Sequence, residues 1–547
     1  MRQRFTLLLL IVCLVAKAQT NPERLQASID SVFKNYSQPG NPGVAALIVK
    51  DGNVIFKKGY GLANLEYNIP ITPASVFDIA SVSKQFTGFA ISTLIQQGKL
   101  SPDDDIHKYL PDVPLFAQPI TVGNLIHHTS GLRDWPEALH AAGWRWDEAF
   151  AWEDIMRMVK KQHDLDFVPG SQYQYSNTGY NLLAAIVEKT TGKTLAQWLD
   201  ENLFKPLGMN STQVLVDYSK VVKNLAGSYY NDGGIYHKSN DELTAFGSSS
   251  MFTSVEDLSK WVIRFQKGLD DKDPVFLRMI ETGKLNNGSS IGYAYGLGVS
   301  SANGVKNISH TGSWASYATV ISNYPAERLS IILLSNAGGF DSFGSANTVA
   351  KLFFKGQSKK EQPREDLSSK PTVNVDTAIL KKYAGTYKLG STWFVTLTLE
   401  DGKLMTQANG EDKFATEMKS DTVLWVPAYN SSMTFLQITD KAGALKYRGN
   451  VSPRITPVKM DIAKLGLYAG TYYSKELETT YRITLENGKL IAHHMRLGDF
   501  DLMPDIIAAD NFSSSSGNIK FFKDNHNKVA GFKLSGGRIR NIVFDRQ

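Results

Sequence analysis

A five-residue pattern occurs twice in the last third of this chain and limits how that part can fold. Residues 383–387 and 468–472 both read Tyr-Ala-Gly-Thr-Tyr, 85 residues apart. Each copy continues through an alternating run to a two-residue turn, Asp-Gly at 401–402 and Asn-Gly at 487–488. Asp-Gly and Asn-Gly suit a two-residue turn between antiparallel strands, because both residues of such a turn need positive φ. The repeat predicts two small antiparallel β-barrels, at residues 373–460 and 461–547.

The chain before the repeats is long enough to form a further domain. The 547 residues are 42% hydrophobic and 20% charged, which is typical of a globular protein. Residues 357–372 (QSKKEQPREDLSSKPT) are charged, contain proline and are poor in apolar side chains, so we interpret them as a linker. We expect the preceding domain to span residues 20–356.

That domain mixes strand and helix patterns. Residues 43–58 alternate around Asp51-Gly52 and predict a hairpin. Residues 82–97 carry apolar side chains at helical spacing, and Ser254 with Asp257 three residues on predicts a capped helix start. The other elements that we expect here are a helix at 178–190 and buried strands at 318–322 and 330–335.

The first eighteen residues have the pattern of a secretory signal. Arg2 and Arg4 precede an apolar run of about eleven residues, and Ala-Lys-Ala at 16–18 is a small-x-small cleavage site. The run is too short to span a bilayer, although an uncleaved anchor is the alternative. Cleavage would remove Cys13, the one cysteine of the chain. We expect an exported protein, periplasmic or extracellular, without disulfides and without a membrane span.

The net charge does not favour polyanionic partners. The formal charge is +6, and losing Arg2, Arg4 and Lys17 with the signal would leave about +3. This is too little to indicate binding to nucleic acid or to a membrane surface.

Three short motifs carry candidate chemistry: Ser-Val-Ser-Lys at 81–84, Tyr-Ser-Asn at 175–177 and His-Thr-Gly at 310–312. Ser81 opens a predicted helix, so Lys84 would lie one turn later on the same face. The amides and the positive dipole end of that helix start would face an anion forming at Ser81. A serine hydroxyl is a poor nucleophile until a base takes its proton, and a lysine at i+3 can reach it.

The second and third motifs supply further groups. A phenol has a pKa of about 10, and a nearby ammonium would lower the pKa of Tyr175 toward working pH. Asn177 offers an amide that can hold both Lys84 and a substrate carbonyl. Gly312 would let substrate approach the backbone, and the next amide, that of Ser313, would complete an oxyanion hole.

In this order, Ser-x-x-Lys, Tyr-x-Asn and His-Thr-Gly resemble the serine β-lactamase and penicillin-binding-protein superfamily. The tyrosine version of the middle motif is similar to class C β-lactamases, related esterases, DD-peptidases and D-aminopeptidases. The resemblance spans roughly residues 25–355, and the two barrels after it resemble the D-aminopeptidase arrangement. It implies an α+β protein: a β-lactamase-like α/β sandwich, with an antiparallel sheet flanked by helices, followed by two lipocalin-like barrels. Supporting stretches lie at 59–63, 125–132, 254–258 and 295–298.

The resemblance also implies roles for the motif residues. Ser81 would be acylated, Lys84 and Tyr175 would share base and acid duty, and the amides of Ser81 and Ser313 would bind the oxyanion. The residues expected to contact substrate are Asn177, His310, Thr311, Gly312 and Ser313. No cofactor and no metal are implied.

The implied function is a secreted serine hydrolase that cleaves amide or ester bonds through an acyl-enzyme. Its substrates would be small molecules or peptides: D-amino-acid peptides, cell-wall (peptidoglycan) fragments or small esters. Class C β-lactamases generally have a charged Lys where this chain has His310, which is mostly neutral at pH 7, so we expect weak β-lactamase activity at most. The alternative is a penicillin-binding sensor or scaffold with little turnover.

Several competing signals have simpler interpretations. A second Ser-x-x-Lys at 31–34 is expected on a surface helix, and a second Tyr-x-Asn at 229–231 in a loop. Gly-x-Ser-x-Gly at 288–292 lacks the strand and helix that a nucleophile elbow needs. The paired histidines at 127–128 and 493–494 lack a metal-binding frame. Trp144, Trp146 and Trp152 are expected in the core, with a place in a substrate cleft as the alternative.

Overall fold

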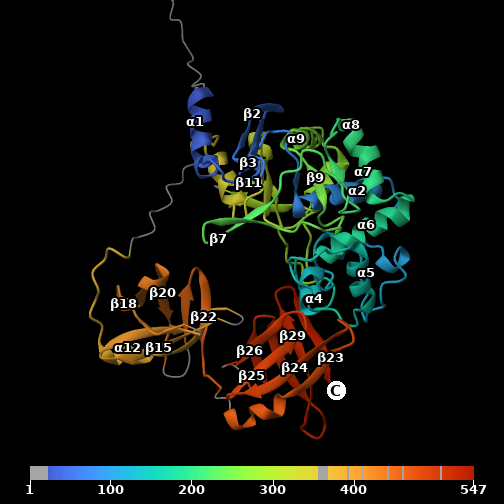
Figure 1. Cartoon of the computed structure of the whole chain (residues 1–547). Helices are drawn as coiled ribbons and strands as arrows, with labels where there is room; N and C mark the ends of the chain where they lie inside the picture. The colour runs from blue at the N-terminus through green and yellow to red at the C-terminus, as the bar shows by residue number, and fades with distance from the viewer. Residues whose placement is uncertain are drawn as a thin grey trace, which may run out of the picture.

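The computed structural model describes residues 22–354 and 367–547, apart from residue 303 and short gaps at 391–392, 410, 440–442, 459–460 and 506–507. The predicted signal at 1–18 and most of the predicted linker lie outside the described residues. Figure 1 shows an α/β domain and two separate all-β domains, of which the C-terminal one lies against helix α4 of the α/β domain.

The α/β domain is built on one six-stranded antiparallel sheet, in the order β10-β11-β12-β13-β1-β2. The predicted hairpin is confirmed: Asp51 and Gly52 both have positive φ, 52° and 79°, between the first two strands. The two predicted buried strands form β12 and β13. The strands are β1 (Val44–Lys50), β2 (Asn53–Tyr60), β10 (Gly298–Ala302), β11 (Val305–Trp314), β12 (Tyr317–Tyr324) and β13 (Leu329–Ser335).

Helices cover both faces of this sheet. Helix α9 (Val255–Asp270) packs on one face, and helices α1 (Pro22–Val32) and α11 (Ser342–Lys351) pack on the other. Strand β1 is consequently buried on both sides, with Leu47 in one core and Ile48 in the other. The β-lactamase-like α/β sandwich is confirmed.

The core beside α9 contains the helices that carry the motifs. Helix α2 (Lys84–Gln96) follows a 3-10 turn at Ala80–Ser83, and α6 (Asn177–Thr191) ends at Gly192 with φ 71°. The remaining helices are α3 (Val122–Ile126), α4 (Trp135–Ala141), α5 (Trp152–Lys161), α7 (Leu195–Leu199), α8 (Lys205–Leu207) and α10 (Pro274–Met279). The small strands are β3 (Leu62–Asn64), β4 (Ile69–Pro70), β5 (Phe77–Asp78), β6 (Gln213–Val214), β7 (Tyr229–Asp232), β8 (Ile235–Lys238) and β9 (Met251–Thr253).

The predicted capped start of α9 is confirmed, because the Ser254 hydroxyl accepts from the Asp257 amide at 3.2 Å. One local expectation needs correction. Residues 229–231, expected in a loop, form strand β7 and pair with β8. The Gly233-Gly234 turn, with φ 56° and 94°, makes this hairpin possible.

The two repeats fold as antiparallel barrels, the first nearly closed and the second closed. In the first, β17 and β18 form the two ends of a nine-stranded sheet, yet a single residue, Thr416, separates them along the chain. Its elements are α12 (Thr377–Tyr383), β14 (Gly385–Lys388), β15 (Phe394–Glu400), β16 (Lys403–Ala408), β17 (Phe414–Ala415), β18 (Glu417–Met418), β19 (Val423–Val426), β20 (Ser431–Leu436), β21 (Ala444–Tyr447) and β22 (Asn450–Ile455).

The second barrel closes through pairing of its first and last strands. Its strands are β23 (Gly470–Ser474), β24 (Thr479–Glu486), β25 (Lys489–His494), β26 (Gly498–Pro504), β27 (Asn511–Ser514), β28 (Gly517–Lys523), β29 (Val529–Gly536) and β30 (Ile539–Arg546). Both predicted two-residue turns have positive φ at each position.

The repeated Tyr-Ala-Gly-Thr-Tyr motif joins the first and last strands of each repeat, β14 to β22 and β23 to β30. In the second copy the buried Tyr472 hydroxyl donates to the Tyr468 carbonyl at 2.7 Å, and Arg546 of the last strand donates to the Ala469 carbonyl. A Cβ on Gly470 would lie 2.9 Å from the Arg546 side chain, so glycine leaves room for this arginine to lie close to the motif. The first copy makes the same contacts through Tyr387, Tyr383, Arg454, Ala384 and Gly385.

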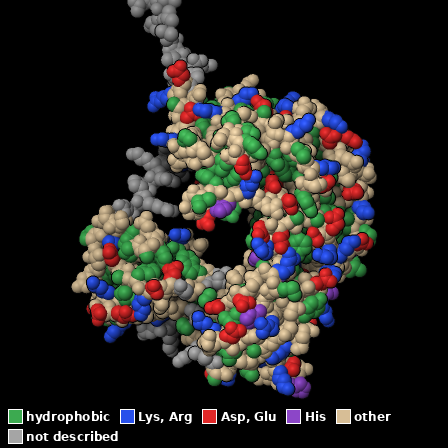
Figure 2. Space-filling view, viewed as in Figure 1, with side chains coloured by type: hydrophobic (Ala, Val, Ile, Leu, Met, Phe, Trp, Pro, Cys, Tyr) green, Lys and Arg blue, Asp and Glu red, His purple; other side chains and the backbone are tan. Residues whose placement is uncertain are grey.

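Figure 2 shows an opening between the α/β domain and the two barrels, with charged side chains on its rim. Within the described residues, no helix has the length and apolar character needed to cross a membrane.

Replacing Tyr472 with Phe should lower the free energy of unfolding by about 1–3 kcal/mol, because the Tyr468 carbonyl loses its buried donor. Chemical denaturation of the full chain measures this change. Tyr473→Phe is the matched control, since the neighbouring side chain is half-buried. Equal stability of the two variants would contradict the role of the motif.

Candidate active site

Three of the predicted catalytic side chains meet at the start of α2. Lys84 Nζ lies 3.1 Å from Ser81 Oγ and 2.7 Å from Asn177 Oδ1, and it donates to the Ser248 carbonyl at 2.7 Å. The same Nζ lies 4.9 Å from the centre of the Tyr175 ring. The structure therefore brings together residues 81, 84, 175 and 177, as the sequence predicts.

The nucleophile candidate lies on a strained turn. Ser81 belongs to the 3-10 turn that precedes α2, next to Ala80, whose φ is 47°. The carboxylate of Asp78 accepts from the Ala80 amide at 2.7 Å and holds this backbone. Positive φ at a non-glycine residue costs energy and is maintained only where the surrounding structure imposes it.

Ser81 opens into a cavity of about 710 Å³. Lys84 lies beneath it, fully buried, so its amine reaches the cavity through Ser81 and Asn177. Of the three clustered tryptophans, Trp146 lines this cavity, whereas Trp152 stacks on Phe246. Of the predicted site residues, those lining the cavity are Ser81, Tyr175, Asn177, His310, Thr311 and Ser313.

Gly312 needs a correction. It does not line this cavity, and a Cβ there would lie 2.2 Å from the Ile79 carbonyl oxygen and 2.4 Å from Thr319 Oγ1. The missing side chain lets β11 pack against the turn that carries Ser81, not against substrate. Its neighbours Thr311 and Ser313 point to the opposite side and are exposed.

The protonation states also differ from the expectation. Burial lowers the pKa of the Lys84 amine well below its usual value, an effect that Asp134 opposes and Arg538 reinforces. Burial raises the pKa of the Tyr175 phenol, and the nearby Ser81 hydroxyl offsets this only in part. Burial thus opposes the expected lowering of the Tyr175 pKa and favours the neutral phenol, while it also favours the neutral form of the Lys84 amine.

The sequence interpretation missed Asp134. Its fully buried carboxylate accepts from the backbone N–H of Asn177 at 2.6 Å and from the side-chain Nδ2 of Asn177 at 3.2 Å. This fixes the amide of Asn177 with Oδ1 toward Lys84 and leaves one N–H of Nδ2 for a substrate carbonyl. The sequence signal for this residue is its position, since Asp134 is an acidic residue that directly follows the family-like stretch at 125–132.

Two histidines border the site in neutral form. Burial, together with Lys84, lowers the pKa of His310 to about 3. His310 Nδ1 lies 2.6 Å from the Thr311 carbonyl, which can only accept, so Nδ1 carries the proton and Nε2 accepts from the Tyr293 hydroxyl at 2.9 Å. His128 is buried against the Tyr175 ring and accepts from the Ser176 amide.

Three of the other competing signals lie where they were expected, unlike residues 229–231, which form strand β7. Ser31 is exposed on α1 and donates to the Ser28 carbonyl. Residues 288–292 form a loop with no helix after it. His493 and His494 alternate on β25, the first bound to Asp499 and the second buried. Within the described ranges, no cluster of three His, Cys, Asp or Glu side chains could hold a metal.

Comparison with known proteins agrees with this geometry. The β-lactamase family model matches residues 29–353, more than half of the chain, and the chain belongs to that family. Penicillin-binding protein 4* of Bacillus subtilis is 27% identical over 435 residues, covering 76% of this chain and 94% of its own.

Two solved structures share the fold. The octameric penicillin-binding protein homologue from Pyrococcus abyssi aligns over 87% of this chain and 99% of its own, with a TM-score of 0.56 and 21% identity. The D-amino acid amidase of Ochrobactrum anthropi aligns over 60% of this chain and 97% of its own, with a TM-score of 0.51 and 23% identity. Family membership and site geometry together support a serine hydrolase.

The stability of the protein should fall as pH drops below the pKa of an unfolded histidine. The pKa of His310 is about 3 in the folded chain and about 6.5 when unfolded, so between these values the unfolded state binds more protons. The free energy of unfolding then falls by up to about 1.4 kcal/mol per pH unit. His310→Asn should flatten this dependence, as measured by denaturation between pH 4 and 7.

The exposed His526 provides the control, because His526→Asn should keep the wild-type slope. If His310→Asn also kept that slope, a neutral buried His310 would be ruled out.

Proposed function

We propose that this protein is an exported acyl-enzyme hydrolase that cleaves amide or ester bonds at Ser81. The observation that carries the proposal is the buried Lys84 amine, 3.1 Å from the Ser81 hydroxyl at the floor of an open cavity. A lowered pKa makes the unprotonated form of the Lys84 amine easier to reach, so this amine can act as a base toward the Ser81 hydroxyl.

The reaction proceeds in two steps, acylation of Ser81 and then hydrolysis of the acyl-enzyme. Lys84 takes the Ser81 proton as Oγ bonds to the substrate carbonyl carbon, and the carbonyl oxygen becomes an oxyanion facing the amides of Ser81 and Ser313. The bond to the leaving nitrogen or oxygen then breaks, and that atom takes a proton from Lys84 through the Tyr175 hydroxyl. Water next attacks the ester carbon and gives up a proton, releasing the acid and restoring the Ser81 hydroxyl.

The proposed substrates are D-amino-acid peptides, peptidoglycan fragments or small esters. The cavity volume suits a peptide-sized ligand, and its wall of Trp135, Trp146 and Trp314 suits apolar or ring-shaped groups. The neutral His310 supports weak β-lactamase activity at most, because it offers no fixed charge to an antibiotic carboxylate. Relatives include a penicillin-binding protein and an amidase, which fits both peptide and amide substrates.

A fluorophosphonate probe should add one label to the mature protein at Ser81, detected by intact mass and peptide mapping. Ser81→Ala should abolish the label and hydrolysis of p-nitrophenyl esters and D-amino-acid amides. Ser31→Ala is the matched control, because it alters the other Ser-x-x-Lys motif on exposed α1. Undiminished labelling of Ser81→Ala would refute the nucleophile, and a single turnover without a steady state would favour the sensor alternative.

Tyr175→Phe separates catalysis from folding. The Tyr175 hydroxyl is buried and has no hydrogen-bond partner among the described residues, so its removal should not lower the free energy of unfolding. We expect kcat to fall by about 100- to 10,000-fold because proton transfer to the leaving group loses its donor. Tyr173→Phe, at an exposed neighbouring phenol, should keep wild-type kcat. A Tyr175→Phe enzyme with wild-type kcat would remove Tyr175 from the mechanism.

A further inference from the structure

The C-terminal barrel contributes a residue to the cavity that holds Ser81. The turn between β29 and β30 inserts beside α4, and Arg538 at its tip lines this cavity. Gly537 has φ 48°, and a Cβ there would lie 2.6 Å from the Glu137 carboxylate. The turn therefore lies in contact with the Glu137 side chain of α4.

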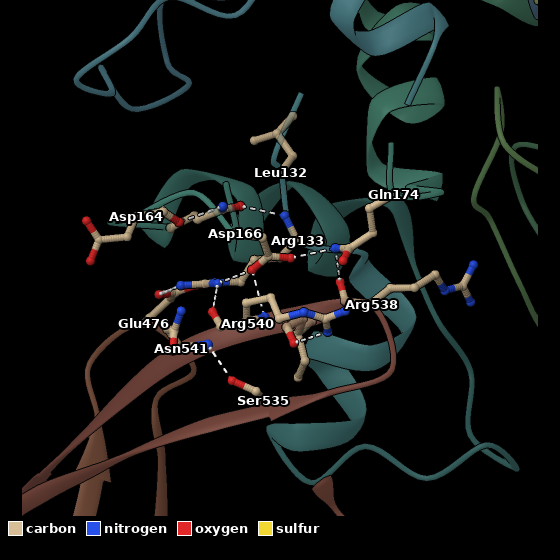
Figure 3. A network of polar contacts seen from close by, with 12 residues as sticks. Leu132, Arg133, Asp164, Asp166, Gln174, Glu476, Ser535, Arg538, Arg540 and Asn541 are labelled. Atoms are coloured by element: carbon tan, nitrogen blue, oxygen red, sulfur yellow. Dashed lines mark hydrogen bonds and ion pairs between the residues drawn. The ribbon is translucent and has the colours of Figure 1, made fainter. Parts of the chain in front are cut away.

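A buried ion cluster fixes this turn against the α/β domain. Arg133, 1% exposed, donates to Asp166 at 2.5 Å, to the carboxylate of Glu476 in the barrel, and to the Arg540 carbonyl. Asp166 in turn accepts from the Arg540 amide at 2.7 Å (Figure 3). Removing one partner of such a cluster would leave a buried charge unpaired, so the two domains are held together at this point.

The neighbouring Gln174 extends this clamp to Arg538 itself. Its Nε2 donates to Asp166 Oδ2 at 2.8 Å and to the Arg538 carbonyl at 3.0 Å. Figure 3 shows the Arg538 side chain directed away from the ion cluster. Gln174 thus fixes the backbone of Arg538, while the Arg538 guanidinium lies near the Tyr175 ring.

The guanidinium lies in the cavity wall beside the catalytic residues. Arg538 Nε pairs with the buried Asp134 carboxylate at 2.9 Å, and the group lies 5.4 Å from the Tyr175 ring centre. Arg538 Nη2 is 3.9 Å from a Glu137 oxygen, beyond hydrogen-bond length, and the side chain is 35% exposed. Since a guanidinium has five N–H donors, those on its two Nη atoms remain for a ligand in the cavity.

The other charged side chains that line the cavity, Lys238 and Asp147, are more than half exposed. Lys238 pairs with Glu66, and Asp147 pairs with Arg145. His310 is neutral and both of its ring nitrogens are bonded. An anionic group of a bound substrate would therefore find its donors at Arg538, beside Tyr175 and Asn177.

We infer that Arg538, supplied by the C-terminal barrel, binds a carboxylate of the substrate and so gives this hydrolase a preference for acidic substrates. This inference rests on the proposed function, since it names the substrate class of the same site. It makes the barrel part of the substrate site.

Two matched substrate pairs test the inference. One pair carries the carboxylate on the leaving-group side, as acetyl-D-Ala-D-Ala and its C-terminal carboxamide. The other carries it on the acyl side, as succinyl-D-Ala p-nitroanilide and its methyl ester. The wild-type enzyme should favour the acid over its neutral partner in at least one pair, by a ratio of kcat/KM on the order of 10- to 100-fold.

The Arg538→Gln variant should lose that ratio, and Arg538→Lys should keep part of it because the charge remains. The matched control is Arg482→Gln, at an exposed position on β24 of the same barrel that does not line the cavity, which should keep the wild-type ratio. The thermal midpoint of each variant is measured in parallel. If Arg538→Gln does not fold, the Arg538→Lys ratio alone decides, and an unchanged ratio there counts against the inference.

The outcomes distinguish the inference from the proposed function. Equal kcat/KM for acid and neutral partner in both pairs, or a preference that persists in Arg538→Gln, overturns the role of Arg538. Labelling of Ser81 by a neutral fluorophosphonate together with such a result leaves the hydrolase intact. Neither labelling nor turnover in the wild-type protein overturns both.

Discussion

The active site depends on keeping an amine at a fully buried position. Taking an ammonium out of water is costly unless every N–H finds an acceptor. Here Ser81, Asn177 and the Ser248 carbonyl surround Lys84 Nζ, one acceptor for each possible donor. They come from the turn before α2, from the start of α6 and from the segment before β9, so these segments must meet for the amine to be buried at all.

The same burial affects the protonation of both Lys84 and Tyr175. Desolvation disfavours the charged form of an amine and of a phenol alike, so both Lys84 and Tyr175 are pushed toward neutrality. Asp134 is the balancing charge: it favours the protonated amine and orients Asn177, while its own charge is met by Arg538 from the barrel. The α/β domain and the C-terminal barrel therefore each supply one partner of the Asp134–Arg538 pair. The buried ion pairs of Arg133 with Asp166 and Glu476 hold the two domains together next to it.

Much of this could be predicted from local sequence. The hairpin at Asp51-Gly52, the helix ending at Gly192 and both barrel turns follow from backbone conformations that few residues tolerate. The nucleophile and its lysine lie one turn apart, so their proximity is a property of the chain. Gly312 was assigned the wrong neighbour, because a glycine indicates a close approach without saying from which side. The sequence does not predict strand β7, because a Gly-Gly pair such as the one at 233–234 is as typical of a loop as of a hairpin turn.

By itself, the sequence determined the β-lactamase-like domain, the paired barrels and the identity of the Ser81, Lys84, Tyr175 and Asn177 group. These depend on periodicity, turn chemistry and motif order, which are written within short stretches of chain. The tertiary structure alone decided that Lys84 is desolvated, that burial raises the pKa of Tyr175 and that Arg538 of the last hairpin lines the cavity that holds Ser81. Burial and long-range ion pairs arise from segments that meet only after folding, and no local pattern encodes them.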